Sequence, residues 1–199
     1  WTGVVCLLPL FAAQVPFSVP QGEVQLTVLD VGQGLSIVIK GANHTIVYDA
    51  GPKYGASFDT GQQIVTPFLR NQGIGKIDKL IVSHNDNDHA GGAEALYRNF
   101  EIDQTLRSRP VNAEDIHCDR VNGWRMDGVN YSLIKRTGIA QNQSSNDLSC
   151  ILLVKTKRYT ILLPGDISSK VEEQASMRRI KDVNLLISPH HGSATSSGP

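Results

Sequence analysis

The sequence predicts a mixed α/β domain whose chemistry lies at the ends of its strands. Its 199 residues are 40% hydrophobic, which suits one domain with a buried core. Apolar β-branched runs of strand length alternate with segments of helical period. Four of the six histidines follow apolar strands directly, in two clusters far apart in the sequence, which predicts one convergent site. The other two, His44 and His117, are expected at the surface or in strands.

The composition limits the partners and the cross-links. Lys plus Arg and Asp plus Glu both number 19, so the net charge is zero and no global basic field attracts nucleic acid. A polyanion would have to bind through a local patch and through bound metals. Cys6, Cys118 and Cys150 are too few and too scattered for a disulfide framework or a C-x-x-C zinc site. We expect all three to be structural, with Cys6 and Cys150 as small core residues.

The first residues differ from the rest of the chain. Trp1–Ala13 is apolar but shorter than the roughly 20 residues that span a bilayer. It also lacks an initiator methionine and the charged front of a signal peptide. It is either the tail of a transmembrane helix or a core or interfacial segment. Because Pro16 and Pro20 mark an extended linker, we expect a membrane-proximal segment with its linker over 1–23 and the folded domain over 24–199.

The sequence pattern of the first half of the domain predicts three strands, then a helix, then another strand and another helix. Strands are expected over 24–29, 35–40 and 44–48, the first two joined by the turn Asp30–Gly34. A helix over 61–72 has Ile64, Val65, Phe68 and Leu69 on one side and ends at Gly73, with Pro67 able to shift its start or kink it. A strand over 78–83 and a helix over 92–100 follow.

The second half is less regular. Residues 101–130 have no clear period, and we expect an irregular excursion anchored by Trp124 and Met126. The other elements follow in order: a strand over 129–134, a polar loop over 137–147, a hairpin of 148–155 and 158–163 turning at Thr156-Lys157, a helix over 168–179 with Ser168 as its N-cap, and a strand over 183–188.

The segment Ser83–Gly92 carries the pattern H-x-D-x-D-H directly after a strand. Alternate residues of an extended segment point the same way, so His84 and Asp86 can share one metal. Asp88 and His89, past the turn, can reach a second. A lone His-Asp pair is more often a solvated turn. Four potential ligands between a buried strand and a Gly-Gly step favour a metal-binding loop instead.

Two further strands end in carboxylates and one ends in histidines. Asp49 follows the third strand and can orient a metal-bound histidine, although it can also simply initiate a turn before Gly51-Pro52. Asp166 repeats this arrangement and suits a ligand that bridges two metals. The last expected strand ends at His190 and His191.

Together these motifs resemble the metallo-β-lactamase-like domain at the carboxyl end of ComEC, the DNA-uptake channel protein of competent bacteria. The resemblance covers nearly the whole chain from residue 26 onward, in family order. H-x-D-x-D-H alone indicates the superfamily, whereas D-V-G-Q-G before it and P-H-H-G-S after it are specific to ComEC-like proteins. The matching stretches are Leu29–Gly34, Tyr48–Gly51, Ser83–Gly92, Trp124 with Asp127–Val129, Asn146–Ser149, Gly165-Asp166 and Pro189–Ser193.

The resemblance implies an αββα four-layer sandwich, here truncated before the last strands and helix of the family, with a metal centre at the strand ends. It also assigns residues to roles. The metal-binding set is His84, Asp86, Asp88, His89, Asp166 and one of His190 or His191, with His191 favoured. Asp88 and His190 are the candidate catalytic residues, His190 near the phosphate, and Asp49, Gln33, Asn146 and Ser149 are candidate supporting residues.

This chain departs from the family pattern at three places. Most superfamily members carry a second histidine where Asp86 stands, so the site is richer in oxygen and favours Mn²⁺ or Mg²⁺, with Zn²⁺ as the alternative. Asn146 and Ser149 occupy the region of a mid-chain histidine ligand, so one metal should be held more weakly. Leu35 stands where many members have an acidic residue, which argues against a direct role there.

The function implied by the resemblance is hydrolysis of a phosphodiester with two divalent ions, which can activate a bridging water and clamp phosphoryl oxygens. The family context implies DNA as substrate, with one strand degraded while the channel passes the other. It also implies a bacterial inner-membrane protein, this domain on the periplasmic or extracellular side, and other competence proteins as partners. Two alternatives are a non-catalytic DNA-guiding domain, which the missing ligand suggests, and a hydrolase of small esters or lactams.

Overall fold

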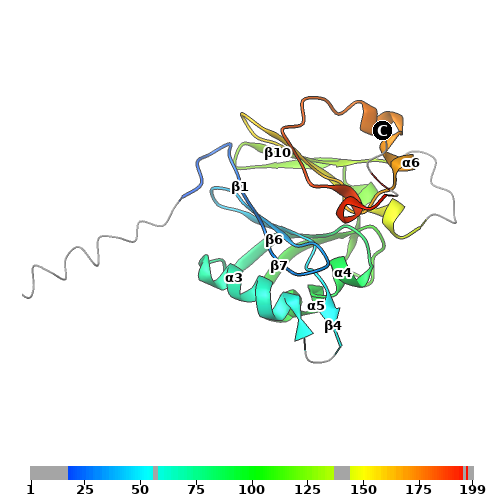
Figure 1. Ribbon diagram of the computed structural model, residues 1–199. Helices are drawn as coiled ribbons and strands as arrows, with labels where there is room; N and C mark the ends of the chain where they lie inside the picture. The colour runs from blue at the N-terminus through cyan, green and yellow to red at the C-terminus, as the bar shows by residue number, and fades with distance from the viewer. Residues whose placement is uncertain (1–17, 56–57, 137–143, 195, 197–199) are drawn as a thin grey trace, which may run out of the picture.

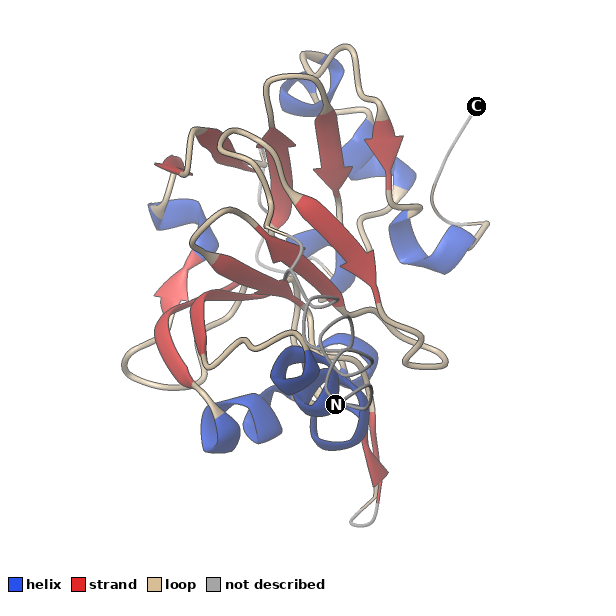
Figure 2. Ribbon diagram, turned by 90° about the vertical axis from the view of Figure 1, so that its left-hand side faces the viewer, coloured by secondary structure: helices blue, strands red, loops and turns tan. Residues whose placement is uncertain are grey.

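The structure, a computed structural model, describes residues 18–55, 58–136, 144–194 and 196. Two sheets face each other and helices cover their outer faces, as Figures 1 and 2 show from two sides. The αββα arrangement is therefore confirmed. The apolar segment 1–13 with Cys6, and residues 137–143 of the expected polar loop, lie outside the described residues. No helix among the described residues is long and apolar enough to cross a bilayer.

The first sheet has six strands in the order β1-β2-β3-β6-β7-β8. β1, β2 and β3 are antiparallel, whereas β3, β6, β7 and β8 run parallel. The parallel strands end at the same edge, so the loops that follow β3 and β6 meet there. The strands are β1 (Gln25–Val28), β2 (Ile37–Lys40), β3 (Thr45–Tyr48), β6 (Lys76–Val82), β7 (Glu101–Arg107) and β8 (Ile116–His117). The pair β4 (Lys53–Tyr54) and β5 (Phe58–Asp59) lies apart.

Helices α3 (Thr66–Asn71) and α5 (Ala93–Asn99) cover the outer face of this sheet. Their apolar residues, such as Leu69 and Leu96, pack against buried strand residues such as Val47 and Leu80. The expected helix over 61–72 begins with a π-helical turn, Gly61–Val65, which runs into α3. Gly73, with φ of 69°, ends it in the left-handed conformation that glycine allows. The single turn α4 (Asn87–Ala90) follows β6.

The second sheet has the order β13-β12-β11-β10-β9. The hairpin predicted from Thr156-Lys157 is confirmed as the antiparallel pair β11 and β12. Tyr48, Tyr131 and Leu152 belong to the core between the two sheets, and Ile167 and Val171 pack the outer helices onto the second sheet. The elements are β9 (Gly123–Met126), β10 (Val129–Ile134), β11 (Ile151–Lys155), β12 (Thr160–Leu163), β13 (Leu185–Leu186), α6 (Ser169–Glu172) and α7 (Ala175–Arg178).

Two expected segments are corrected by the structure. Residues 101–130 are not an irregular excursion, because they form β7, β8 and β9. Only the last three residues of β7 are buried, and β8 has two residues, so neither gives a readable period. The expected helix over 168–179 is two separate turns, α6 and α7, since Gln174 between them is extended, with φ of −63° and ψ of 150°.

His44 lies directly before β3 and is buried, at 4% exposure, so of the two expected positions, surface or strand, the surface is wrong. Its Nδ1 lies 2.7 Å from Asp127 Oδ2, and its Nε2 lies 2.7 Å from the Tyr131 hydroxyl. Both partners belong to the β9–β10 hairpin of the other sheet. Asp127 and Gly128 form its turn with φ of 49° and 83°. The reason for the burial is therefore a contact with residues 83 and 87 positions away, which local pattern does not reveal.

A disulfide joins Cys118 to Cys150, so the expectation of unpaired structural cysteines is wrong for this pair. Cys118 follows β8 of the first sheet, and Cys150 precedes β11 of the second. Both are buried, at 2% exposure. The bond is a covalent link across the sandwich, between segments 32 residues apart in sequence.

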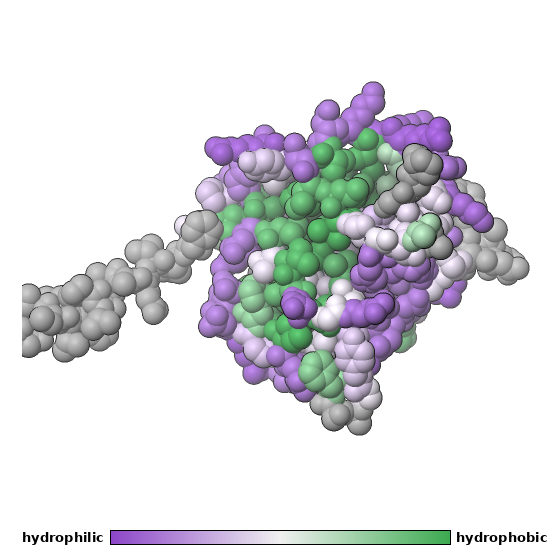
Figure 3. All heavy atoms as spheres, viewed as in Figure 1, coloured by the Kyte–Doolittle hydropathy of each residue, from purple (hydrophilic) through white to green (hydrophobic). Residues whose placement is uncertain are grey.

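Apolar side chains form a band on the face of the molecule seen in Figure 3. β1 and β13 are edge strands of their sheets, and they expose Val28 at 52%, Leu185 at 42% and Leu186 at 53%. The described residues thus leave part of the apolar surface of the sandwich uncovered.

Loss of the disulfide should destabilise the fold. Closing a loop of this length lowers the entropy of the unfolded chain, worth about 3 to 4 kcal/mol in the loop-closure model. We expect urea unfolding of the oxidised chain at higher concentration than that of the reduced chain. A Cys118→Ser, Cys150→Ser double variant should have the urea midpoint of the reduced chain, and reductant should not change that midpoint. Equal urea midpoints for the oxidised and reduced wild type would contradict a stabilising disulfide between Cys118 and Cys150.

The pair of His44 and Asp127 should make stability depend on acid. Burial acts to raise the pKa of Asp127, but hydrogen bonds from Asn43 and His44 outweigh it and lower that pKa from 3.8 to about 2. A lowered carboxyl pKa contributes stability that is present above the unfolded value and lost as pH falls through the folded value. The melting-temperature advantage of wild type over Asp127→Asn should therefore be constant above pH 4 and shrink towards pH 2. A difference that persists unchanged to pH 2 would exclude this contribution.

Candidate metal centre

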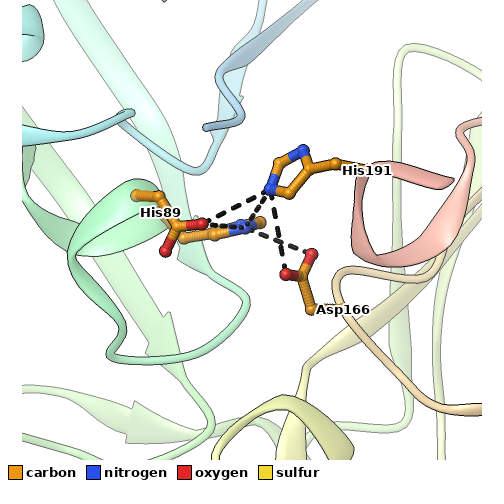
Figure 4. A group of neighbouring side chains, drawn as sticks. His89, Asp166 and His191 are labelled. Atoms are coloured by element: carbon orange, nitrogen blue, oxygen red, sulfur yellow. Dashed lines mark hydrogen bonds and ion pairs between the residues drawn. The ribbon is translucent and has the colours of Figure 1, made fainter. Parts of the chain in front are cut away.

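Four of the predicted ligands come together from three segments of the chain. Asp88 and His89 lie in α4, after β6; Asp166 follows β12; His191 lies in the short 3-10 turn after β13. One ligand atom from each lies within 4.8 Å of the others. Figure 4 shows the rings of His89 and His191 and the carboxylate of Asp166 turned towards a common centre.

His89 lies at the middle of this group. Its Nε2 is 3.1 Å from Asp166 Oδ1, 3.1 Å from His191 Nε2 and 3.8 Å from Asp88 Oδ2. His191 Nε2 is in turn 3.4 Å from Asp88 Oδ2. Two imidazole nitrogens and two carboxylates converging in this way form a donor set that suits a divalent transition metal.

Asp49 fixes His89 from behind. The carboxylate is fully buried, and its Oδ2 accepts a hydrogen bond from His89 Nδ1 at 2.8 Å. It also accepts the backbone N–H and the hydroxyl of Ser83, at 2.6 Å and 2.8 Å. With its proton on Nδ1, His89 presents the lone pair of Nε2 to the cluster. This is the arrangement that the expected orienting role of Asp49 requires.

The electrostatics of the cluster favour a cation. Burial alone would lower the pKa of His89, but the carboxylates of Asp49 and Asp166 outweigh burial and raise it to about 10. The same carboxylates would attract a divalent ion, which would compete with the proton for Nε2.

His84 gives a second indication that metal fits here. Its Nδ1 lies 3.0 Å from the Ser83 hydroxyl, whereas its buried Nε2 has no hydrogen-bond partner and lies 3.6 Å from Asp86 Oδ2. Burial is the main cause that lowers the pKa of His84, which favours the neutral ring. A buried nitrogen without a partner is costly, and a metal ion would satisfy it. The residues present therefore fit the ions that the sequence motif implies.

Three predicted ligands lie outside the group of four: His84, Asp86 and His190. The Asp86 side chain is 46% exposed, and its Oδ2 lies near His84 Nε2 rather than near the four clustered ligands. His190 is not part of the cluster, and its Nε2 lies 3.3 Å from the amide of Asn146. Of the adjacent histidines, the structure thus brings His191 to the cluster. Its partner His190 lies beside one of the predicted supporting residues.

Ser149, another predicted supporting residue, connects the two halves of the site. Its hydroxyl accepts the backbone N–H of Asp166 at 3.1 Å and lies 3.5 Å from His84 Nδ1. It donates to the Asn146 carbonyl at 2.6 Å. Asn146 and Ser149 therefore contact site residues without joining the cluster, in the region where a histidine ligand is missing.

The loop of Gln33 and Gly34 packs directly on α4. Leu35 N–H donates to the Asp88 carbonyl at 3.1 Å, and a side chain at Gly34 would overlap the same carbonyl oxygen. Gln33 thereby lines a cavity of about 340 Å³ together with Asp88, His190 and His191. Leu35 itself is buried in the core between the sheets, which agrees with the absence of a direct role.

Backbone strain is concentrated at the site. Five non-glycine residues in the described part of the chain have positive φ, and three of them are Asp49 (59°), His190 (49°) and His191 (51°). Such conformations cost about 1–3 kcal/mol each and persist where surrounding contacts impose them. The two adjacent histidines share this conformation, which places them in the short turn after β13.

Ser83 is a site residue that sequence reasoning missed. Its hydroxyl contacts Asp49, His84 Nδ1 and His89 Nδ1, the last at 3.3 Å. The available signal was its position between the buried strand and the first histidine of the motif. A small hydroxyl there can bridge the side chains on either side of it.

Replacing Asp49 by Asn should weaken ion binding while leaving every candidate ligand in place. The amide is a poorer acceptor for His89 Nδ1–H, so the ring is less firmly oriented, and Mn²⁺ affinity should fall about 10- to 100-fold by calorimetry. Asp78→Asn is the matched control, because Asp78 also accepts a backbone N–H, from Thr45 at 2.7 Å, but outside the site. Equal affinities for wild type and Asp49→Asn would argue against the orienting role.

Known proteins match both the sequence and the fold. Residues 29–109 match the model of the metallo-β-lactamase superfamily. The competence protein ComA of Neisseria gonorrhoeae is 34% identical over 196 residues, which are 97% of this chain and 27% of that protein. Recombination protein 2 of Haemophilus influenzae is 33% identical over 176 residues, 87% of this chain and 22% of that protein. The chain thus spans about a quarter of the length of these relatives.

Solved structures agree on the fold. A metallo-β-lactamase of Cronobacter sakazakii with an HARLDQ motif superposes with a TM-score of 0.53 at 16% identity, covering 87% of this chain and 67% of that one. At this identity the likeness concerns the arrangement of strands and helices.

Proposed function

Because the chain belongs to the metallo-β-lactamase superfamily and its relatives include competence proteins, we propose that it is the metal-dependent phosphodiesterase domain of a ComEC-type DNA-uptake channel. Members of this superfamily typically bind divalent metals. The observation that carries the proposal is the convergence of Asp88, His89, Asp166 and His191 within 4.8 Å. The substrate is an incoming DNA duplex, of which one strand is degraded and the other transported.

The roles of the residues follow from their positions. Asp88, His89, Asp166 and His191 would hold one ion, and His84 with Asp86 the other, bridged by Asp166. Two ions, when bound, would lower the pKa of a water between them and offer a positive field to the phosphate. Of the candidate catalytic residues, Asp88 is 33% exposed and lines the cavity beside the cluster, where it can position a water.

The rest of the cavity suits a phosphate. Its described lining consists of Gln33, Asp88, His190, His191, Gly192 and Ser193. His190 and Gln33 can donate hydrogen bonds to phosphoryl oxygens from this lining. Asp86 makes the second site richer in oxygen, which favours Mn²⁺ or Mg²⁺ over Zn²⁺.

The disulfide supports a location on the periplasmic or extracellular side of the inner membrane. Disulfides form and persist in oxidising compartments and are rare in the cytosol. The link between Cys118 and Cys150 therefore favours the outer side. Attachment to the membrane would come from the channel region of the whole protein, where other competence proteins would bind.

A second candidate, a non-catalytic domain that guides DNA, is favoured by one observation. Asp86 stays outside the close group, so apart from the shared Asp166 the second ion site rests on His84 and Asp86, with 3.6 Å between their nearest atoms. Hydrolysis of a small ester or lactam has less support, since the described lining of the cavity has no apolar side chain.

Cleavage of linear DNA with Mn²⁺ separates these functions. Asp166→Ala and Asp86→Ala should each lower the cleavage rate at least about 100-fold. Losing a metal ligand lowers activity more than losing a residue that only hydrogen-bonds to a ligand. Asp103→Ala is the matched control, because Asp103 forms an exposed pair with Lys76 away from the site. Binding of DNA without cleavage by the folded wild type would support the guiding domain. Cleavage that survives both site substitutions would indicate a contaminating nuclease.

A further inference from the structure

A buried arginine, Arg107, ends β7 beside the metal-binding motif. In the register of the parallel strands it lies opposite Val82, the last residue of β6 before the motif. Its side chain is 7% exposed, and its Nε lies 3.2 Å from Oδ2 of Asp115, which is itself 3% exposed. Removing a guanidinium from water is unfavourable unless its charge is paired, so the pair with Asp115 accounts for the burial of Arg107. It does not account for the direction in which the two terminal nitrogens, Nη1 and Nη2, point.

The other nitrogens of Arg107 point to the motif and to α5. Nη1 donates to Asn85 Oδ1 at 3.3 Å, and Nη2 donates to the Tyr97 hydroxyl at 3.4 Å. The Asn85 amide donates in turn to the Arg109 carbonyl at 3.0 Å. The oxygen and the nitrogen of the Asn85 amide therefore both bond to residues at the end of β7 or just after it.

Asn85 lies between two candidate ligands, His84 and Asp86. Its tether therefore acts on the backbone that aims both side chains. Asp115 completes the support, because its Oδ2 also accepts the N–H groups of Val111 and Asn112 at 2.8 Å and 2.9 Å. The connection between β7 and β8 is thereby fixed around the guanidinium.

We propose that Arg107 is a positioning residue of the metal centre, which acts through Asn85 to fix the direction of His84 and Asp86. The inference rests on the proposed metal-binding function. It makes the second ion site, the one with fewer candidate ligands, dependent on a side chain that contacts neither ligand. An ion pair with a purely structural role would affect folding stability and leave ion affinity unchanged.

The test measures Mn²⁺ affinity and stability separately on the full chain. Calorimetry gives the dissociation constant, and thermal unfolding in EDTA gives the stability of the ion-free fold. Asn85→Ala should weaken Mn²⁺ binding about tenfold with little change in melting temperature, because the side chain is exposed. Arg107→Lys keeps a charge beside Asp115 but loses the planar fork, so affinity should fall by a similar factor.

A double variant that combines Asn85→Ala with Arg107→Lys shows whether Arg107 acts through Asn85. If Arg107 acts through Asn85, the double variant should bind Mn²⁺ no more weakly than Arg107→Lys alone. Asn99→Ala is the matched control, because its amide donates to Gln62 and to the Ala95 carbonyl, at 2.9 Å and 2.8 Å, and to no residue of the motif. It should leave the affinity unchanged.

The outcomes that overturn the inference differ from those that overturn the function. An unchanged affinity in Asn85→Ala, an equal loss in Asn99→Ala, or losses that simply add in the double variant would each remove the positioning role while the metal centre stands. A wild-type chain that binds no Mn²⁺ would remove the proposed function as well.

Discussion

The buried carboxylate of Asp49 connects the ends of β3 and β6, on which the site depends. Its oxygens accept hydrogen bonds from the Ser83 N–H and hydroxyl and from His89 Nδ1. A carboxylate removed from water persists only where donors of this kind surround it. The two strand ends therefore cannot shift without exposing unpaired polar groups. The bond with His89 Nδ1 also fixes the plane of the His89 ring.

Close backbone contacts hold α4 in this position from two sides. On one side, the Gly34 loop lies against the Asp88 carbonyl. On the other, Gly92 packs against the backbone of Ala50 and Gly61, and Ala50 N–H donates to the His89 carbonyl at 2.8 Å. Only glycine allows such approach, since a Cβ atom would overlap the facing backbone. The glycine-rich loops thus determine where α4 can place its ligands.

The second sheet supplies the remaining residues, and its placement depends on links across the sandwich. The buried Tyr48 hydroxyl donates to the carbonyls of Cys150 and Leu163, at 2.7 Å and 3.2 Å. Cys150 N–H donates to the Ser83 carbonyl at 2.8 Å. These bonds dock β11 and β12 at the end of β6, so Asp166, which follows β12, lies opposite His89. The disulfide of Cys150 makes this docking covalent.

The sequence by itself determined the main strands and helices, and it singled out Ser83–Gly92 as the chemical loop, because periodicity and turn residues report how each segment is buried. It did not predict β7, β8 and β9 or the pairing of Cys118 with Cys150, and it favoured His191 over His190 only through the family resemblance. Those outcomes were decided by the tertiary structure. Cysteine pairing depends on contacts between segments distant in sequence, and so does the meeting of His191 with Asp88, His89 and Asp166 from three separate segments.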